Sequence, residues 1–176
     1  PVLGVDMSST GEVGCLGADY YDAILKAMIS VGYRIPKKAV LISSGPIRSK
    51  IELLKSSKML EERGYKLYGT RGTAKFLEEN GVKIESVGWP DEDVEKNAVS
   101  LIRNREVDFV VNIPKNLSKT ELNNDYQIRR TAIDLNVPLV TNARLASAFI
   151  YSFCKKSQSD LAIDSFSDYV EHKQEW

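Results

Sequence analysis

The feature that most constrains the fold is a regular alternation of short apolar runs with longer amphipathic segments, which begins near residue 37. The first run, Ala39-Val40-Leu41-Ile42, is wholly apolar, as expected for a strand buried on both faces of a parallel sheet. Parallel strands need helical crossovers between them. The sequence therefore predicts an α/β fold with a five-stranded parallel sheet and helices on both faces, its strands near 39–42, 66–69, 82–87, 108–112 and 137–140.

The segments between these strands carry helical periodicity. In the first, Ile47, Ile51 and Leu54 mark one apolar stripe, which Leu53 and Leu60 widen. A polar segment at 114–123 is expected to be a loop. The expected helices lie near 49–63, 73–79, 92–104, 125–135, 142–154 and, at the end of the chain, 165–171.

Residues 1–35 have a different pattern. Residues 2–7 suggest the remnant of a strand, and a helix is expected at 19–30, with Tyr21, Leu25 and Met28 on one face and Gly32 as its C-terminal cap. This is too little for an independent fold. We interpret the chain as a piece of a longer polypeptide, in which 1–35 is the end of a preceding domain with a linker and 36–176 is the main domain.

Composition narrows the classes of function. Lys plus Arg and Asp plus Glu balance at 24 each, which argues against nucleic-acid and membrane partners. Cys15 and Cys154 lack CxxC spacing and are expected to be reduced thiols, and the sole histidine, His172, lies in a polar tail. We therefore expect no metal site and no histidine-based triad. The chain shows neither a run of about 20 apolar residues nor a signal peptide.

Ligands of parallel α/β sheets bind beyond the carboxyl ends of the strands. The second strand is expected to end at Gly69-Thr70-Arg71-Gly72-Thr73, where two threonines three residues apart meet the start of a helix. Free N–H groups and the positive end of the helix dipole favour an anion there. The sequence thus predicts an anion pocket at this turn.

The other strand ends add hydroxyls, amides, lysines and an indole, which suit a small anionic ligand. Each also has a structural interpretation: the threonines as helix caps, Trp89 as a plug at the sheet edge, Asn112 as a partner of backbone groups, and Lys50 as a solvated helix lysine. No nucleophile has a base beside it, and dinucleotide and Walker fingerprints are absent. The candidate binding residues are Lys50, Thr70, Thr73, Trp89, Asn112, Lys115 and Asn142.

Several motifs resemble the methylglyoxal-synthase-like domain, a three-layer Rossmann- or flavodoxin-like sandwich. The resemblance rests on Gly69-Thr70-Arg71-Gly72-Thr73, residues 108–112, residues 126–132 and residues 137–142. The version with Ile128-Arg129-Arg130 is similar to the C-terminal regulatory domain of the carbamoyl-phosphate synthase large subunit. Residues 6–14 resemble the end of that subunit's second ATP-grasp unit.

The resemblance implies a parent ligase that makes carbamoyl phosphate from bicarbonate, ATP and glutamine-derived ammonia, for arginine and pyrimidine synthesis. The parent would use ATP, Mg and K, and would work with a glutaminase small subunit. The domain itself would hold no cofactor and no catalytic residue; it would bind an effector, with homo-oligomer contacts as an option. The implied location is the bacterial cytoplasm or, alternatively, the mitochondrial matrix.

The resemblance also assigns an effector's phosphate or carboxylate to Lys50, Thr70 and Thr73. Family members that bind N-acetyl-L-glutamate have motifs similar to Trp89-Pro90, Asn112 and Ile113-Pro114. Those members have asparagines where this chain has Lys115 and Asp125, and nucleotide-binding members have a threonine at Pro114. A nucleotide and an N-acetylglutamate type of effector both stay open.

Two rival functions remain. A catalytic methylglyoxal synthase needs a carboxylate in a Gly-Gly-Asp turn after the third strand and a histidine near the fourth helix. Here that turn reads Gly88-Trp89-Pro90-Asp91, and the only histidine is His172. Asp91 or Asp93 would have to serve as a displaced base without an electrophilic partner. The other rival is a purely structural domain that serves in oligomer contacts.

Overall fold

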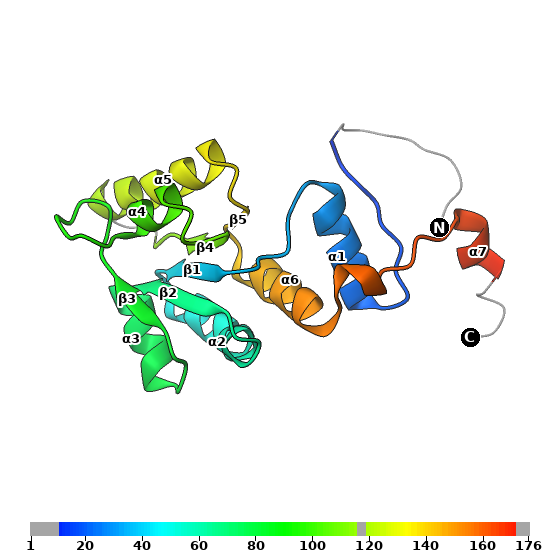
Figure 1. Ribbon diagram of the computed structural model, residues 1–176, viewed down its shortest axis with the longest axis horizontal. Coiled ribbons are helices and arrows are strands. Elements are labelled where there is room, and N and C mark those ends of the chain that lie inside the picture. The colour runs from blue at the N-terminus through cyan, green and yellow to red at the C-terminus, as the bar shows by residue number, and fades with distance from the viewer. Residues whose placement is uncertain (1–10, 116–118, 172–176) are drawn as a thin grey trace.

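The computed structural model of the chain describes residues 11–115 and 119–171 (Figure 1). Its centre is a five-stranded, all-parallel sheet in the order β3-β2-β1-β4-β5, which confirms the predicted fold class. The strands are β1 (Ala39–Ser44), β2 (Lys66–Thr70), β3 (Glu85–Val87), β4 (Phe109–Ile113) and β5 (Leu139–Val140). The helices are α1 (Tyr20–Ser30), α2 (Ile47–Glu62), α3 (Arg71–Glu79), α4 (Ala98–Arg103), α5 (Lys119–Asp134), α6 (Ala143–Lys155), the short 3-10 helix η1 (Gln158–Asp160) and α7 (Phe166–Glu171).

The central strand β1 is buried along its whole length. It pairs with β2 on one side, where Ile42 is opposite Gly69, and with β4 on the other, where Ser43 is opposite Asn112. Since all three strands run in the same direction, their carboxyl ends meet at one edge of the sheet. In Figure 1 this is the edge that faces away from α1.

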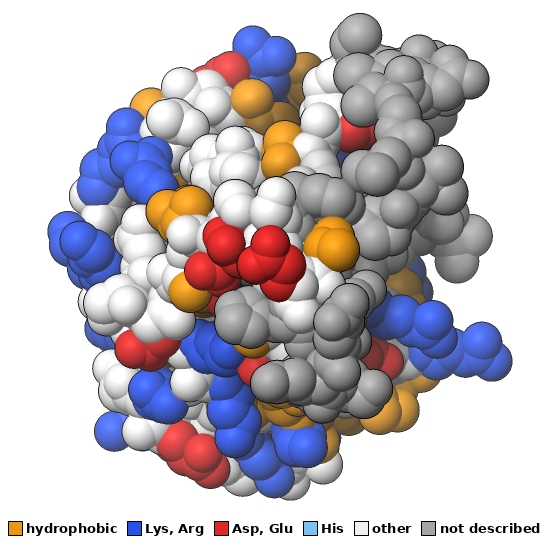
Figure 2. All heavy atoms as spheres, turned by 90° about the vertical axis from the view of Figure 1, so that its right-hand side faces the viewer, with side chains coloured by type: hydrophobic (Ala, Val, Ile, Leu, Met, Phe, Trp, Pro, Cys, Tyr) orange, Lys and Arg blue, Asp and Glu red, His pale blue; other side chains and the backbone are white. Residues whose placement is uncertain are grey.

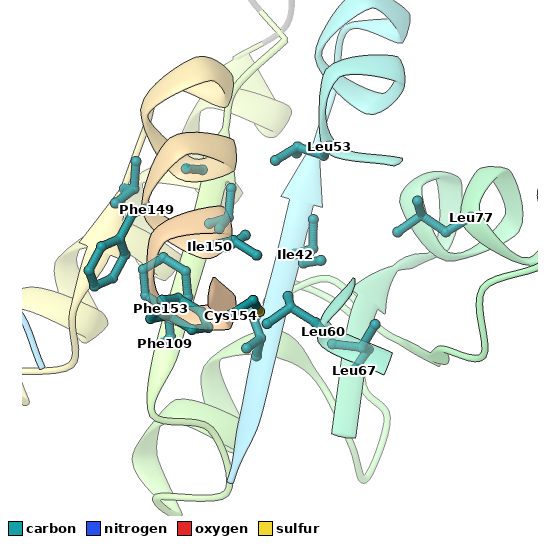
Figure 3. Packing of buried hydrophobic residues seen from close by; sticks show 14 of the residues in the cluster. Ile42, Leu53, Leu60, Leu67, Leu77, Phe109, Phe149, Ile150, Phe153 and Cys154 are labelled. Atoms are coloured by element: carbon teal, nitrogen blue, oxygen red, sulfur yellow. The ribbon is translucent and has the colours of Figure 1, made fainter. Parts of the chain in front are cut away.

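Two hydrophobic layers cover the two faces of the sheet. The layer below α1, α2, α3 and α6 contains Phe109, Phe149 and Phe153, whose rings meet edge to face at centroid distances of 5.1–6.4 Å (Figure 3). Edge-to-face pairs of this kind stabilise a core beyond their buried area. The layer below α4 and α5 is formed by a second set of buried residues, among them Leu41, Tyr68, Leu101 and Ile128.

The apolar stripe predicted for α2 is partly wrong. Ile47 and Ile51 are 57% and 60% exposed, whereas Leu53 and Leu60 are buried. Ser56 also belongs to the buried face, and its hydroxyl donates to the carbonyl of Leu53. Serine is small enough to let α2 lie close to α6, where Ser56 Oγ is 3.3 Å from Ser147 Oγ. Leu145 of α6 is likewise exposed.

The N-terminal helix α1 is packed into the domain. Leu25 and Met28 lie in the same buried cluster as Phe149, and the hydroxyl of Tyr33, after the helix, donates to the carbonyl of Leu139 at 2.6 Å. The predicted strand remnant at 2–7 lies outside the described residues. A division of the chain at residue 35 stays a prediction.

Three element boundaries differ by three residues or more from those predicted. β3 begins at Glu85 instead of 82. α4 begins at Ala98, not near 92, because Asn97 forms a capping box with Ser100; residues 91–95 therefore precede the helix and are not its first turn. α5 begins at Lys119, not near 125, so part of the expected polar loop is helical.

The surface carries charges of both signs. Figure 2 shows basic and acidic side chains interspersed on the face at the α1 end of the molecule. Within the described ranges, no helix is long and apolar enough to cross a membrane. Cys15 and Cys154 are both free thiols, and burial raises the pKa of the Cys154 thiol to about 11, which makes it unreactive at neutral pH.

Candidate functional site

The turn between β2 and α3 presents unpaired backbone donors. Thr70 ends β2 in an extended conformation, with φ −61° and ψ 149°, and α3 begins at the next residue. No side chain of the described residues caps this helix end, so the N–H groups of its first turn are left for another partner. The nine-residue helix also directs the positive end of its dipole at this point. The local geometry therefore suits an anion, and an anion pocket at this turn stays a prediction.

Both threonine hydroxyls hold α3 against the end of β1. Thr70 Oγ1 donates to Ser43 Oγ at 3.1 Å, and Thr73 Oγ1 donates to the carbonyl of Ser44 at 3.1 Å while accepting the Ser44 N–H at 2.9 Å. Both threonines are 2% exposed. Their position at the turn was predicted, but their hydroxyl hydrogens bond to β1. Direct donation to a ligand would require these hydroxyls to rotate.

Two lysines lie beside the same turn. Lys50 Nζ donates to the carbonyl of Gly72 at 2.9 Å. Partial burial, and then the charge of Lys115, lower the pKa of Lys50 below its usual value. Lys115 follows β4 and packs directly against Gly45, where a side chain on residue 45 would collide with the Cβ of Lys115. A glycine is therefore needed at position 45, and the two lysines together favour a bound anion.

A buried polar network joins β4 to α5. Asn112 is fully buried; its Nδ2 donates to Asp125 Oδ1 at 2.8 Å, and its Oδ1 accepts from Arg129 Nη1 at 3.1 Å. Asp125 is also buried. The amide of Asn112 therefore orients a carboxylate and a guanidinium at the strand ends, beside Ser43.

The segment after β3 is bonded to α5 and to α3. The N–H of Trp89 donates to Glu92 Oε2 at 3.2 Å, and the same carboxylate pairs with Arg71 at 2.8 Å. Asn124 Nδ2 donates to Asp91 Oδ1 at 2.7 Å. The Trp89 side chain is half-buried against the hydrophobic layer under α4 and α5, so it partly fulfils the role of a plug at the sheet edge.

The structure does not bring all seven candidate residues to one place. Lys50, Thr70, Thr73 and Lys115 surround the β2–α3 turn, with Asn112 and Trp89 on its flank. Asn142 instead caps α6, since its Oδ1 accepts the Leu145 N–H at 3.0 Å. Within the described part of the chain, no hydrogen bond joins Asn142 to the other six. Its capping role accounts for its position.

The structure adds residues that the candidate set did not include. Ser44 Oγ and Asn124 Oδ1 are buried and have no hydrogen-bond partner among the described residues. Arg129 and Asp125 belong to the Asn112 network, and Arg71 holds the Trp89 segment. The spacing of Asp125 and Arg129, one helical turn apart, was a usable signal for a shared face; for Ser44 there was none beyond its place at a strand end.

The described residues include no cluster of three or more His, Cys, Asp or Glu side chains that could hold a metal ion. His172 lies outside the described residues. The donor set at the strand ends is dominated by amides, hydroxyls, ammonium groups and guanidinium groups. Such a set suits an anion.

Comparison with known proteins gives a family match. The family described as the MGS-like domain matches residues 52–141, just over half of the chain. The matched range begins within α2 and ends just after β5. It holds five of the seven candidates, namely Thr70, Thr73, Trp89, Asn112 and Lys115, whereas Lys50 and Asn142 lie just outside it at either end.

Two relatives are much longer proteins. The chain is 40% identical over 163 residues to Multifunctional protein CAD of Squalus acanthias, a match that covers 85% of this chain and 7% of that protein. It is 37% identical over 165 residues to the mitochondrial carbamoyl-phosphate synthase [ammonia] of Homo sapiens, which covers 91% of this chain and 11% of that protein. The chain thus spans only a small part of the length of these relatives.

A solved structure of methylglyoxal synthase from Elizabethkingia anophelis is also similar. The TM-score is 0.46, with 15% sequence identity, and the match covers 78% of this chain and 93% of that one.

Proposed function

Because the chain belongs to the family of MGS-like domains, we propose that it is the regulatory domain of a carbamoyl-phosphate synthase. It binds a small anionic effector at the carboxyl ends of its strands and thereby modulates carbamoyl phosphate synthesis by the rest of a longer protein. The family match and the names of the relatives support the parent enzyme. The geometry at the strand ends supports the binding of an anion.

The observation that carries the proposal is the uncapped start of α3 with Lys50 beside it. The N–H groups of the first turn lack a side-chain cap among the described residues, and the Lys50 ammonium group lies against the carbonyl of Gly72. Gly72 has no side chain to keep a ligand away from the backbone. A phosphate or carboxylate at this point would bond to the backbone and pair with the lysine at once.

The surroundings limit the charge of the ligand. Lys50 and Lys115 attract an anion, whereas Asp125 places a buried carboxylate nearby in the Asn112 network. The Ser44 hydroxyl, unpartnered within the described residues, offers one further hydrogen bond. This arrangement suits a ligand with one charged end and a polar body, which fits both a nucleotide and an N-acetylglutamate type of effector.

The effector would act by shifting a population of states. Thr70 and Thr73 connect the anion site to the end of β1, and Asn112 connects the neighbouring end of β4 to α5. A ligand that makes different contacts in two arrangements of these elements favours one of them. Coupling between two sites of this kind is typically about 1–3 kcal/mol.

A catalytic role for this chain has less support. The segment after β3 holds Asp91, but its carboxylate accepts a hydrogen bond from Asn124 and faces no electrophilic partner among the described side chains. We therefore expect ATP, Mg and K to be bound by other parts of the parent, together with a glutaminase subunit where glutamine is the nitrogen source. The cytoplasm is the expected location, with the mitochondrial matrix as the alternative.

The test is a thermal-shift titration with a panel of effectors: nucleoside monophosphates including inosine monophosphate, uridine triphosphate, ornithine and N-acetyl-L-glutamate. One class should raise the melting temperature in a concentration-dependent manner, since a ligand that binds only the folded state stabilises it. Lys50→Gln should abolish most of that shift, whereas Lys58→Gln, at an exposed lysine on the same helix, should leave it intact. A flat response to the whole panel would favour the purely structural role.

A further inference from the structure

A second concave site lies at the opposite end of the sheet. A cavity of about 620 Å³ is formed by the connection from α1 to β1, by the residues that precede β4 and β5, and by Gln158 of η1. Its volume lies in the range of roughly 300–1,000 Å³ that is usual for small-molecule sites. The amino ends of β1, β4 and β5 lie beside it, so it is separated from the candidate effector site by the length of the strands.

The charge of this cavity is strongly unbalanced. Arg34, Lys37, Lys38 and Arg105 line it, against a single carboxylate, Asp108. In a chain whose formal net charge is zero, this is an excess of three positive charges around one cavity. Such a concave cationic surface attracts a multiply charged anion more strongly than a flat one does.

The single carboxylate, that of Asp108, already accepts hydrogen bonds from the backbone. Asp108 Oδ2 accepts the N–H groups of Lys37 at 2.7 Å and Lys38 at 3.0 Å, and Oδ1 accepts the N–H of Ala39 at 3.1 Å. These bonds fix the backbone at the start of β1. They use the carboxylate oxygens for backbone donors, and no ion pair joins Asp108 to either lysine ammonium group in the described structure.

The arginines have a structural role that the lysines lack. Arg105 Nη1 donates to the carbonyl of Leu135 at 2.6 Å, and Arg34 Nη2 donates to the carbonyl of Asn136 at 2.7 Å, so both complement the carboxyl end of α5. Each guanidinium still has further N–H donors. Lys37 and Lys38 are exposed, and their ammonium groups have no ion-pair partner among the residues described.

One side of the cavity is lined by apolar and aromatic side chains, whereas Asn136 and Gln158 add neutral polar groups elsewhere. Tyr33 is fixed by its bond to the carbonyl of Leu139 and by edge-to-face contact with Phe149 at 5.9 Å. Ile35, Val107 and Pro138 complete this side of the cavity. A ligand that fits must therefore combine a multiply charged group with an apolar or flat body.

The geometry points to a second binding site at this cavity, for an organic phosphate of about nucleotide size. Lys37 and Lys38 bind the phosphate oxygens, with spare donors of Arg34 and Arg105, and the body of the ligand lies against Tyr33. A monocarboxylate would leave most of the positive charge unbalanced, whereas a diphosphate would neutralise it. This proposal is independent of the effector site at the other end of the strands.

The test is calorimetric titration of the chain with inorganic pyrophosphate at an ionic strength of about 0.15 M, where the Debye length is about 8 Å. Lys37→Gln/Lys38→Gln should weaken binding by about 10-fold or more, because each lysine makes a charge-assisted bond. The matched control Lys58→Gln/Lys83→Gln removes the same charge at two exposed lysines elsewhere and should change the affinity by less than about 2-fold, since exposed charges beyond a Debye length are screened. Equal losses in both double variants, or no binding to the unaltered chain, would overturn the site.

A third variant distinguishes ligand binding at the cavity from ligand binding at the effector site. Lys50→Gln/Lys115→Gln removes the lysines of the effector site and should leave pyrophosphate binding at the cavity in place. In this variant, uridine diphosphate should bind more tightly than pyrophosphate because its nucleoside part lies against the apolar walls. Loss of all pyrophosphate binding in this variant, or no gain from the nucleoside, would contradict the proposal.

Discussion

Thr73 and Ser44 hold each other by two hydrogen bonds in opposite directions: the Ser44 N–H donates to Thr73 Oγ1 at 2.9 Å, and Thr73 Oγ1 donates to the Ser44 carbonyl at 3.1 Å. One buried hydroxyl thus satisfies both backbone groups of the last residue of β1. It ties the start of α3, where we place the anion, to the central strand of the sheet.

Thr73→Val tests the pair directly. Valine matches threonine in shape but leaves the N–H and the carbonyl of Ser44 buried without partners, which costs about 1–3 kcal/mol for a buried group. We expect the free energy of unfolding, measured in urea, to fall by that amount. Thr141→Val, at an exposed threonine, is the control. Equal stability of the two variants would show that the pair contributes nothing.

The lowered pKa of Lys50 predicts how effector binding depends on pH. Burial and the charge of Lys115 disfavour the ammonium form in the free protein, so its pKa lies below the usual 10.5. A bound anion favours the ammonium form and raises this pKa again, so binding takes up a proton. The affinity should therefore decrease as the pH rises through the lowered pKa of Lys50.

Calorimetry in buffers of increasing pH measures this dependence. Lys50→Arg keeps its charge throughout the range, because a guanidinium does not lose its proton in proteins. Its affinity for the effector should stay flat where that of the unaltered chain falls. The same decrease in both proteins would assign the titration to another group.

Asp125→Asn should strengthen the binding of an anionic effector. The asparagine Oδ1 can still accept from Asn112 Nδ2, so the buried bond is kept while a negative charge is removed. At an effective dielectric constant of about 20, removing a like charge at several ångströms favours the anion by about 1 kcal/mol or more, which is several-fold in affinity. The gain should shrink with added salt. An unchanged or weaker affinity would contradict the placement of the ligand near Asn112.

Glu85 should contribute to stability above pH 4.5 and not in acid. Hydrogen bonds from Lys96 and then Lys66 lower its pKa in the folded protein below the usual 4.5. Between these two values the unfolded chain binds more protons than the folded one, so stability rises with pH and is lost as the pH falls through the folded pKa. Because the Glu85 side chain is 40% exposed, the effect should stay below about 1 kcal/mol.

Urea unfolding of Glu85→Gln between about pH 3 and pH 7 measures the contribution of Glu85. The variant should be less stable than the unaltered chain at neutral pH, and the difference should shrink towards the acid end. Glu78→Gln, at an exposed glutamate of α3, serves as the control and should run parallel to the unaltered chain. A constant difference across the range would mean that the loss comes from packing and not from the charge.

Much of the fold could be predicted because the hydrophobic pattern that indicates each strand or helix lies within that segment. The apolar run Ala39-Val40-Leu41-Ile42 and the periodic helices define a parallel α/β sheet regardless of what each helix contacts. The helix and strand boundaries that were predicted wrongly depend on tertiary contacts. α5 begins at Lys119 although its first turns include Asn123 and Asn124, which are poor helix formers. The hydrogen bonds that join Asn124 to Asp91 and Asp125 to Asn112 offset that preference.

The candidate site could be predicted in part for the same reason. The rule that ligands bind at strand ends brought Lys50, Thr70 and Thr73 together, and the structure places them at one turn. It could not show that the threonine hydroxyls bond to β1, because these contacts join residues that are far apart in the sequence. Nor could it separate Asn142, a helix cap, from the residues around the turn.

The most direct test of an anion site at the start of α3 is a nuclear magnetic resonance titration of the isotopically labelled chain with the effector that stabilises it. The largest changes in amide chemical shift should fall on Arg71, Gly72 and Thr73, with smaller changes around Lys50 and Asn112. The changes at the first turn of α3 should persist in Lys37→Gln/Lys38→Gln, the variant that weakens the proposed second site at the opposite end of the sheet. Saturable binding with the largest changes anywhere else, and none at the first turn of α3, would contradict an anion site there.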